Sequence, residues 1–124
     1  RGDRSRHPDL IEATRHALAG RPYVIENVQE ARRRLIKPLM LCGTMFDLRL
    51  QSHRYFEIQP NAGPLVLSCR HSSADAARDH GTKQTEAAFR DALGCPWMTV
   101  HEARQAIPPA YTEYIGLQLM AALR

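Results

Sequence analysis

The spacing of apolar residues predicts a helix and two strands in the first half of the chain. From Pro8 to Gly20, apolar side chains recur at intervals of three and four, as they do along one face of a helix of about three turns. The run Pro22–Ile25 is β-branched and aromatic and lies between turn-forming and polar residues, which predicts a buried strand. Arg54–Ile58 alternates in the manner of a second strand. Pro38–Phe46 is apolar but contains a glycine, so we interpret it as a short packed helix or turn and not as a strand.

Helical signals return in the last third of the chain. Thr85–Leu93 and Thr99–Ala106 predict two short helices, the first of them closed by Gly94, and Pro108-Pro109 begins a final helix. Apolar side chains form a stripe along this final helix and a second apolar edge beside it. The stripe is Tyr111, Ile115, Leu119 and Ala122, and the edge is Tyr114, Leu117 and Ala121. We interpret Trp97 and Tyr111 as core residues and not as platforms for base stacking.

Helix, short turn and buried strand in succession are typical of an α/β fold. Residues 1–7 are a polar stretch that predicts a flexible lead-in, and residues 8–59 would supply the sheet part. Residues 60–84 include the polar run Ser68–Lys83, which predicts a long surface loop or a small inserted element. Residues 85–124 would form a helical part. We therefore expect one α/β unit.

Composition restricts the class of protein. The chain has 124 residues, of which 44% are hydrophobic and 24% charged, as expected of one globular domain. No run approaches the roughly 20 apolar residues that span a bilayer, and no apolar run near the start predicts a secretory signal. The three cysteines, Cys42, Cys69 and Cys95, are an odd number without tight spacing, which favours structural thiols in a reducing, intracellular compartment.

Charge suggests a polyanionic partner. Lys and Arg number 17 against 13 Asp and Glu, and only Lys37 and Lys83 are lysines. Arginine matches phosphates and base edges well, although GC-rich coding gives the same bias. The basic run Arg32, Arg33 and Arg34 has two interpretations, a phosphate contact or a solvated helix face.

A metal site has little support in the sequence. Cys69-Arg70-His71 and His80 are residues of the kind that bind zinc, but their spacing is irregular and a second C-x-x-C pair is missing. The sequence therefore predicts no metal site.

A family resemblance begins at the first predicted strand. Pro22–Ile25 is followed by Glu26, Asn27 and Val28, at the strand end where functional residues lie in an α/β sheet. The whole run, P-Y-V-I-E-N-V, resembles the strand and Glu-Asn-Val motif of DNA cytosine-5 methyltransferases. Three further blocks are similar, in the same order, to compact phage and actinobacterial members of that family. They are Pro38–Phe46, His53–Glu57, and Trp97–Thr99 together with Gln105–Gly116.

The resemblance implies a fold, an activity and a location. The chain would be the C-terminal portion of a Rossmann-like methyltransferase fold, with a reduced target-recognition segment within residues 60–84 and a terminal helix packed back on the sheet. The enzyme would transfer a methyl group from S-adenosylmethionine to carbon 5 of cytosine in double-stranded DNA. Its place would be the cytoplasm of a bacterium or of a phage-infected bacterial cell.

The resemblance also assigns roles to single residues. Methylation at carbon 5 needs nucleophilic addition at carbon 6, which loads negative charge into the ring, and a carboxyl group at N3 and the exocyclic amine can neutralise it. Glu26 would be that group, and Asn27 would hold the turn after the strand. Arg54 matches the last arginine of a Q-x-R-x-R motif near the base, while Leu50 and Ser52 depart from that motif. The residues expected to bind DNA are Arg32, Arg33, Arg34 and His53.

Two parts of such an enzyme are absent from the 124 residues. There is no Pro-Cys-Gln nucleophile and no glycine-rich loop for S-adenosylmethionine, and neither Cys42 nor Cys95 stands in a nucleophile context. In the family both parts precede the segments matched here, so an N-terminal half would bind most of the cofactor. That half could be truncated, disordered or on a separate chain. Alternatively, the chain is a noncatalytic remnant that binds DNA or a partner.

Overall fold

The computed structural model describes residues 9–61, 67–71, 77–78 and 85–124. The flexible lead-in expected over residues 1–7 and much of the loop expected over residues 60–84 lie outside the described residues. The helices are α1 (Ile11–Ala17), α2 (Glu86–Leu93), α3 (Val100–Gln105) and α4 (Pro109–Ala122), with 3-10 turns η2 (Gln29–Arg34) and η3 (Gly43–Phe46). The strands are β1 (Tyr23–Asn27), β2 (Leu39–Leu41), β3 (Leu50–Gln51), β4 (Arg54–Gln59) and β5 (Ala77–Arg78). None of the helices in the described ranges is long and apolar enough to cross a membrane.

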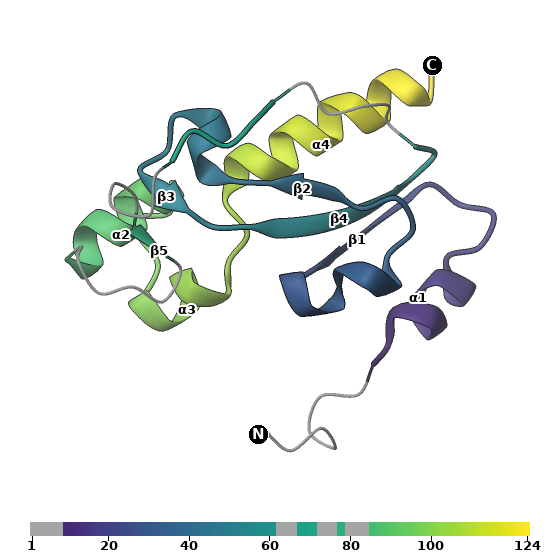
Figure 1. Cartoon of the computed structure of the whole chain (residues 1–124), viewed down its shortest axis with the longest axis horizontal. Helices are drawn as coiled ribbons and strands as arrows, with labels where there is room; N and C mark the ends of the chain where they lie inside the picture. The colour runs from purple at the N-terminus through teal and green to yellow at the C-terminus, as the bar shows by residue number, and fades with distance from the viewer. Residues whose placement is uncertain (1–8, 62–66, 72–76, 79–84) are drawn as a thin grey trace.

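The main sheet has three strands in the order β1-β4-β2 (Figure 1). The central strand β4 is antiparallel to both neighbours, so β1 and β2 run parallel to each other. This confirms the mixed α/β class. The prediction that β1 is a buried strand was wrong: Ile25 is its one buried residue and Val24 is exposed. The reason is that β1 lies at the edge of the described sheet. A separate pair joins β3 and β5 in parallel.

The interpretation of Pro38–Phe46 was wrong for its first part. Leu39–Leu41 forms β2, because these residues pair with β4, and only Gly43–Phe46 forms a helical turn. The glycine in this stretch is required for a steric reason. A Cβ on Gly43 would lie 2.2 Å from the carbonyl oxygen of Leu50. The glycine therefore marks a close approach of two backbone segments and not the absence of a strand.

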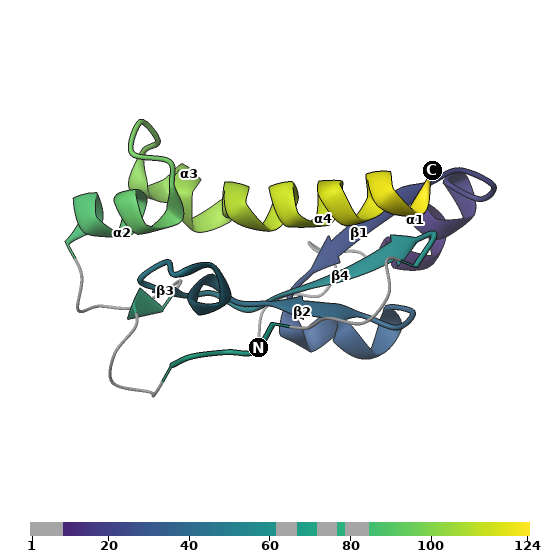
Figure 2. The same cartoon turned by 90° about the horizontal axis from the view of Figure 1, so that it is seen from above.

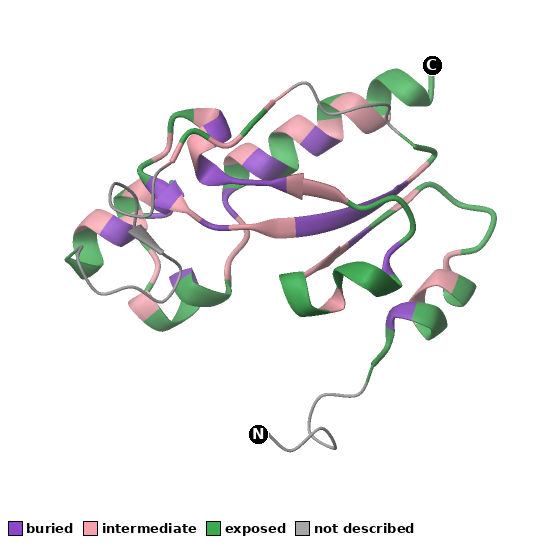
Figure 3. Cartoon of the chain, viewed as in Figure 1, coloured by how far each residue is buried: buried purple, intermediate pink, exposed green. Residues whose placement is uncertain are grey.

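Two layers cover the sheet (Figure 2). Because successive side chains of a strand point to opposite faces, β4 contributes to both layers. On one face Phe56 and Ile58 pack with Tyr111 and Ile115 of α4. On the other face Tyr55 joins the remaining core residues under α1 and η2, which are Ile11, Ile25 and Leu35. In Figure 3 the buried stretch of β4 and the buried positions of α4 mark this core.

The predicted helices are confirmed, with corrections to their length and packing. α1 has seven residues and is shorter than expected. The end of α2 was predicted correctly, since Gly94 closes it in the left-handed conformation with φ 92°. Thr85 and Thr99, the first residues of the predicted helices, are the N-caps, and Thr85 accepts a hydrogen bond from the amide of Ala88. These caps depend on local sequence alone.

The apolar stripe of α4 is buried at its beginning only. Tyr111 and Ile115 are buried, Leu119 is half-buried and Ala122 is exposed. The interpretation of Trp97 as a core residue was wrong, since 74% of its surface is exposed.

A second small core lies between α2, α3 and β3. It consists of Leu50, Phe89, Leu93, Cys95 and Ala103.

Candidate functional site

Glu26 and Arg54 are brought together by the pairing of β1 with β4. Glu26 lies opposite Phe56 in the register, and Arg54 is two residues before Phe56, so both side chains point to the same face of the sheet. The Nε atom of Arg54 lies 3.3 Å from Oε1 of Glu26. Side-chain exposure is 13% for Arg54 and 33% for Glu26. A carboxylate and a guanidinium thus share a partly desolvated place near the end of β1.

Desolvation has the largest effect on the electrostatic environment of Glu26. Burial raises the pKa of this carboxyl group above its ordinary value, and the positive charge of Arg54 opposes the shift without cancelling it. A raised carboxyl pKa brings the group closer to donating a proton at neutral pH. Glu26 therefore differs chemically from a surface carboxylate.

Asn27, the last residue of β1, holds the turn that follows. Its side-chain Oδ1 accepts a hydrogen bond of 2.9 Å from the backbone amide of Val28. This is the local side-chain to backbone bond that asparagine favours at strand ends. The chain then turns into η2, which begins at Gln29.

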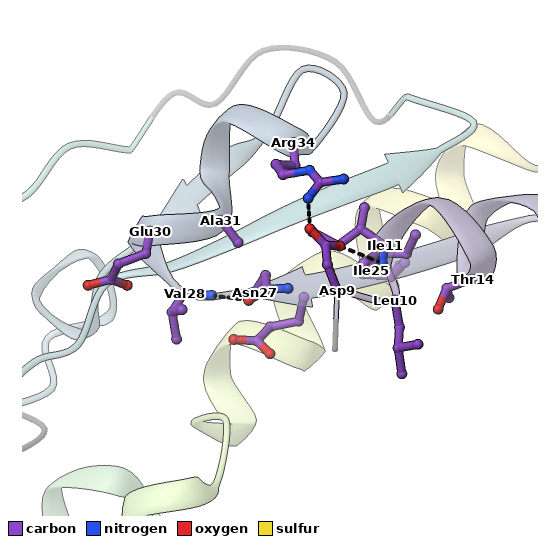
Figure 4. Close-up of a pocket in the computed structure, with 12 residues that line it drawn as sticks. Asp9, Leu10, Ile11, Thr14, Ile25, Asn27, Val28, Glu30, Ala31 and Arg34 are labelled. Carbon is purple, nitrogen blue, oxygen red and sulfur yellow. Dashed lines mark hydrogen bonds and ion pairs between the residues drawn. The ribbon is translucent and has the colours of Figure 1, made fainter. Parts of the chain in front are cut away.

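An open pocket of about 1020 Å³ runs along the outer edge of β1 (Figure 4). All five residues from Val24 to Val28 line it. Successive side chains of a strand point to opposite faces of the sheet, so a pocket that contacts all of them follows the edge of the strand. The start of α1 and the turn η2 form its other walls. Much of the lining is apolar, with Leu10, Val24 and Val28 exposed to solvent.

The three arginines of η2 do not have the same environment. Arg34 forms an ion pair with Asp9, drawn in Figure 4, and its backbone carbonyl accepts a hydrogen bond of 2.9 Å from Arg15. Arg32 and Arg33 are exposed at the surface of the same turn. All three arginines were predicted to contact DNA. Arg34 is exposed like the other two but also takes part in contacts within the fold.

Sequence reasoning missed a buried ionic network around Glu57. Arg15 donates two hydrogen bonds to this carboxylate, at 2.8 and 2.7 Å. The hydroxyl of Tyr23 and the amide of Ile36 each donate one more, both at 2.8 Å. The Arg15 bonds are the main cause that lowers the pKa of Glu57 to about 2. In the sequence Glu57 was one polar position of an alternating strand, and the helix that reaches it starts 46 positions earlier, at Ile11.

His53 lies beside Arg54 in the chain but has different neighbours. Its Nε2 atom lies 3.1 Å from Nε2 of His71 and 3.6 Å from Sγ of Cys69. Ring centroids of the two histidines are 5.3 Å apart. The structure therefore places His53 among metal-binding residue types, whereas Glu26 and Arg54 form a separate pair.

Comparison with known proteins gives no match to this chain. No protein-family model, no curated protein and no solved structure matches it.

Proposed function

We propose that this chain is the glutamate-bearing part of a DNA (cytosine-5)-methyltransferase. The observation that carries the proposal is the pair formed by Glu26 and Arg54: a half-buried carboxyl group with a raised pKa, held 3.3 Å from a guanidinium at the end of β1. The Glu-Asn-Val motif resembles the segment that such enzymes use at this place.

The chemistry assigned to Glu26 needs a carboxyl group that can hold a proton near neutral pH. As a nucleophile adds to carbon 6 of a flipped cytosine, negative charge develops at N3, and a protonated carboxyl group can donate to it. Burial shifts the pKa of Glu26 in that direction. Arg54 then orients the carboxyl group and balances its charge once the proton has gone to the base.

The sheet supports a position within a larger Rossmann-like fold. The strands β1 and β2 run in the same direction on either side of the antiparallel β4, and mixed sheets are common among large α/β folds. Among the described strands β1 pairs on one side only, with β4. Its other edge borders the apolar pocket and presents the exposed Val24 and Val28. We place the N-terminal half, with its cysteine and its S-adenosylmethionine loop, against this edge.

Helix α4 supports the same arrangement from the other side of the sheet. It buries Tyr111 and Ile115 against the sheet but also exposes Leu117 and Met120, at 65% and 57%. A helix that is apolar on opposite sides is typical of a buried position in a larger protein. A further layer of protein over Leu117 and Met120 would complete that burial.

A noncatalytic module that binds DNA is the second candidate. The 124 residues contain no Pro-Cys-Gln nucleophile, and Arg32 and Arg33 are exposed on η2 beside the pocket. Such a module would bind duplex DNA through its phosphates without needing S-adenosylmethionine.

Methyl incorporation separates the two candidates. We expect the purified 124-residue chain alone to transfer no labelled methyl group to DNA and to show weak or undetectable affinity for S-adenosylmethionine. The chain should become active when it is expressed together with the reading frame that precedes it, or with a separate chain that supplies a Pro-Cys motif and a glycine-rich loop. Activity of the 124 residues alone, or a stop codon directly upstream with no such second chain encoded nearby, would favour a different function.

A further inference from the structure

Four potential metal ligands converge at one end of the main sheet. Cys42 directly follows β2, His53 directly precedes β4, and Cys69 and His71 lie in the described segment 67–71. The ligand atoms of all four residues lie within 4.8 Å of one another. Two separations are shorter, 3.1 Å between the Nε2 atoms of His53 and His71 and 3.6 Å between Sγ of Cys69 and Nε2 of His53.

We propose that Cys42, His53, Cys69 and His71 bind one zinc ion. A tetrahedral zinc ion with bonds of about 2.3 Å to sulfur and about 2.0 Å to nitrogen sets its ligand atoms roughly 3.3 to 3.8 Å apart. The separations of 3.1 and 3.6 Å are already close to these values. Since no pair of ligand atoms is more than 4.8 Å apart, small side-chain rotations would bring all four atoms to the spacing of a tetrahedral site.

The donor set selects zinc over the other common divalent ions. Two thiolates and two imidazoles suit zinc, whereas magnesium and calcium require oxygen ligands. Two thiolates also cancel the charge of the ion, so the loaded site is neutral. Neutrality matters here because Cys42 is fully buried and the other three residues are half-buried. Four protein ligands leave no open position for a substrate, which makes this a structural site.

Neighbouring residues support the ligands. The hydroxyl group of Thr44 lies 3.3 Å from Sγ of Cys42 and accepts a hydrogen bond of 3.1 Å from the backbone amide of Arg70. Arg70 stands between Cys69 and His71, so Thr44 connects the segment 67–71 to the turn η3, beside which that segment runs in Figure 1. Such outer contacts orient metal ligands and raise affinity.

The role of the ion follows from the three segments that it would join. A zinc ion bound by these four residues would connect the segment 67–71 to the end of β2 and the start of β4. It also fixes His53, whose carbonyl oxygen accepts a hydrogen bond of 3.2 Å from Arg54. The zinc site stands on its own geometry and does not depend on the proposed methyltransferase activity.

Zinc binding by the 124-residue chain tests this inference directly. We expect one zinc ion per chain after purification under reducing conditions with added zinc. Cobalt in place of zinc should give the visible bands of a tetrahedral site and a thiolate-to-cobalt charge-transfer band. A chain that binds no zinc, a cobalt spectrum without the thiolate band, or a disulfide between Cys42 and Cys69 that persists under the reducing conditions of purification would overturn the proposal.

Variants assign the ligands. The double substitution Cys69→Ser with His71→Ala should weaken zinc binding by more than about 100-fold, because changes in outer contacts alone already cost 10- to 100-fold. His101→Ala alters an exposed histidine outside the group and should leave affinity unchanged. Equal zinc affinity in the double variant and the His101→Ala control would contradict the assignment. If the double variant fails to fold, the cobalt spectrum of the unaltered chain still decides between the outcomes.

Discussion

Two glutamates on paired strands have opposite pKa shifts, and the difference assigns them different roles. Glu57 accepts four hydrogen bonds, two of them from Arg15, and its pKa is lowered to about 2. Glu26 pairs with Arg54 at 3.3 Å, and burial raises its pKa. Hydrogen bonds to the charged form thus prevail at Glu57 and desolvation prevails at Glu26. Glu57 stabilises the fold, and Glu26 is the group to which the proposed function gives the proton transfer.

Glu57 makes stability depend on acid pH. Because its pKa is depressed in the folded chain, its contribution is present above the ordinary carboxyl pKa of about 4.5 and is lost as the pH falls towards 2. Such a shift corresponds to about 3 kcal/mol. Glu57→Gln should lower the free energy of unfolding at neutral pH by roughly that amount, measured by chemical denaturation. Glu12→Gln, which alters the exposed partner of the same Arg15, should cost under about 1 kcal/mol. Equal losses in the two variants would contradict this role.

At the scale of elements, the sequence predicted those parts that depend on local signals. The caps of α2 and α3 could be predicted directly, since Thr99 and Glu102 form a capping box within four residues. The three-residue strand β2 could not, because it exists through pairing with β4. The exposure of Trp97 could not be predicted from the sequence either, because it depends on the position of this residue relative to the small cores of the folded chain.

Two glycines give opposite predictions for the same substitution. Gly43→Ala should destabilise the fold by at least about 1–3 kcal/mol, because the new Cβ would meet the backbone carbonyl of Leu50. Gly116 lies inside α4, and no atom lies within 4 Å of the position that a new methyl group would take, so Gly116→Ala should stabilise by about 0.5–1 kcal/mol. Thermal or chemical unfolding measures both. A neutral Gly43→Ala would mean that η3 and β3 are not in contact.

At the scale of the whole molecule, the candidate site was predictable only through the motif. Glu26 and Arg54 are 28 positions apart, and nothing in the alternation of either strand indicates that they pair. The Cys42, His53, Cys69 and His71 group comes from three segments, so short-range ligand spacing in the sequence does not reveal it. His80, which the sequence suggested as a ligand, lies outside the described residues.

The net charge of +4 and the exposed arginines of η2 predict salt-dependent DNA binding. Replacing Arg32 and Arg33 together by alanine should weaken duplex binding and reduce the slope of log affinity against log salt by about 1 to 2. Arg34 is left in place because it pairs with Asp9. Arg104→Ala, an exposed arginine on α3, is the matched control. Binding that is unchanged between low and high salt would exclude phosphate contacts as its source.

The rate of methyl transfer by the complete enzyme decides whether Glu26 is catalytic. Glu26→Gln keeps the shape of the side chain but removes its acid, so turnover should fall by about 10²–10⁴ while DNA affinity stays nearly unchanged. Arg54→Ala should weaken both turnover and binding, and Glu113→Gln, an exposed glutamate on α4, should alter neither. Near-normal turnover of the Glu26→Gln enzyme would contradict the proposed function, and Glu26 would then be only a half-buried partner of Arg54.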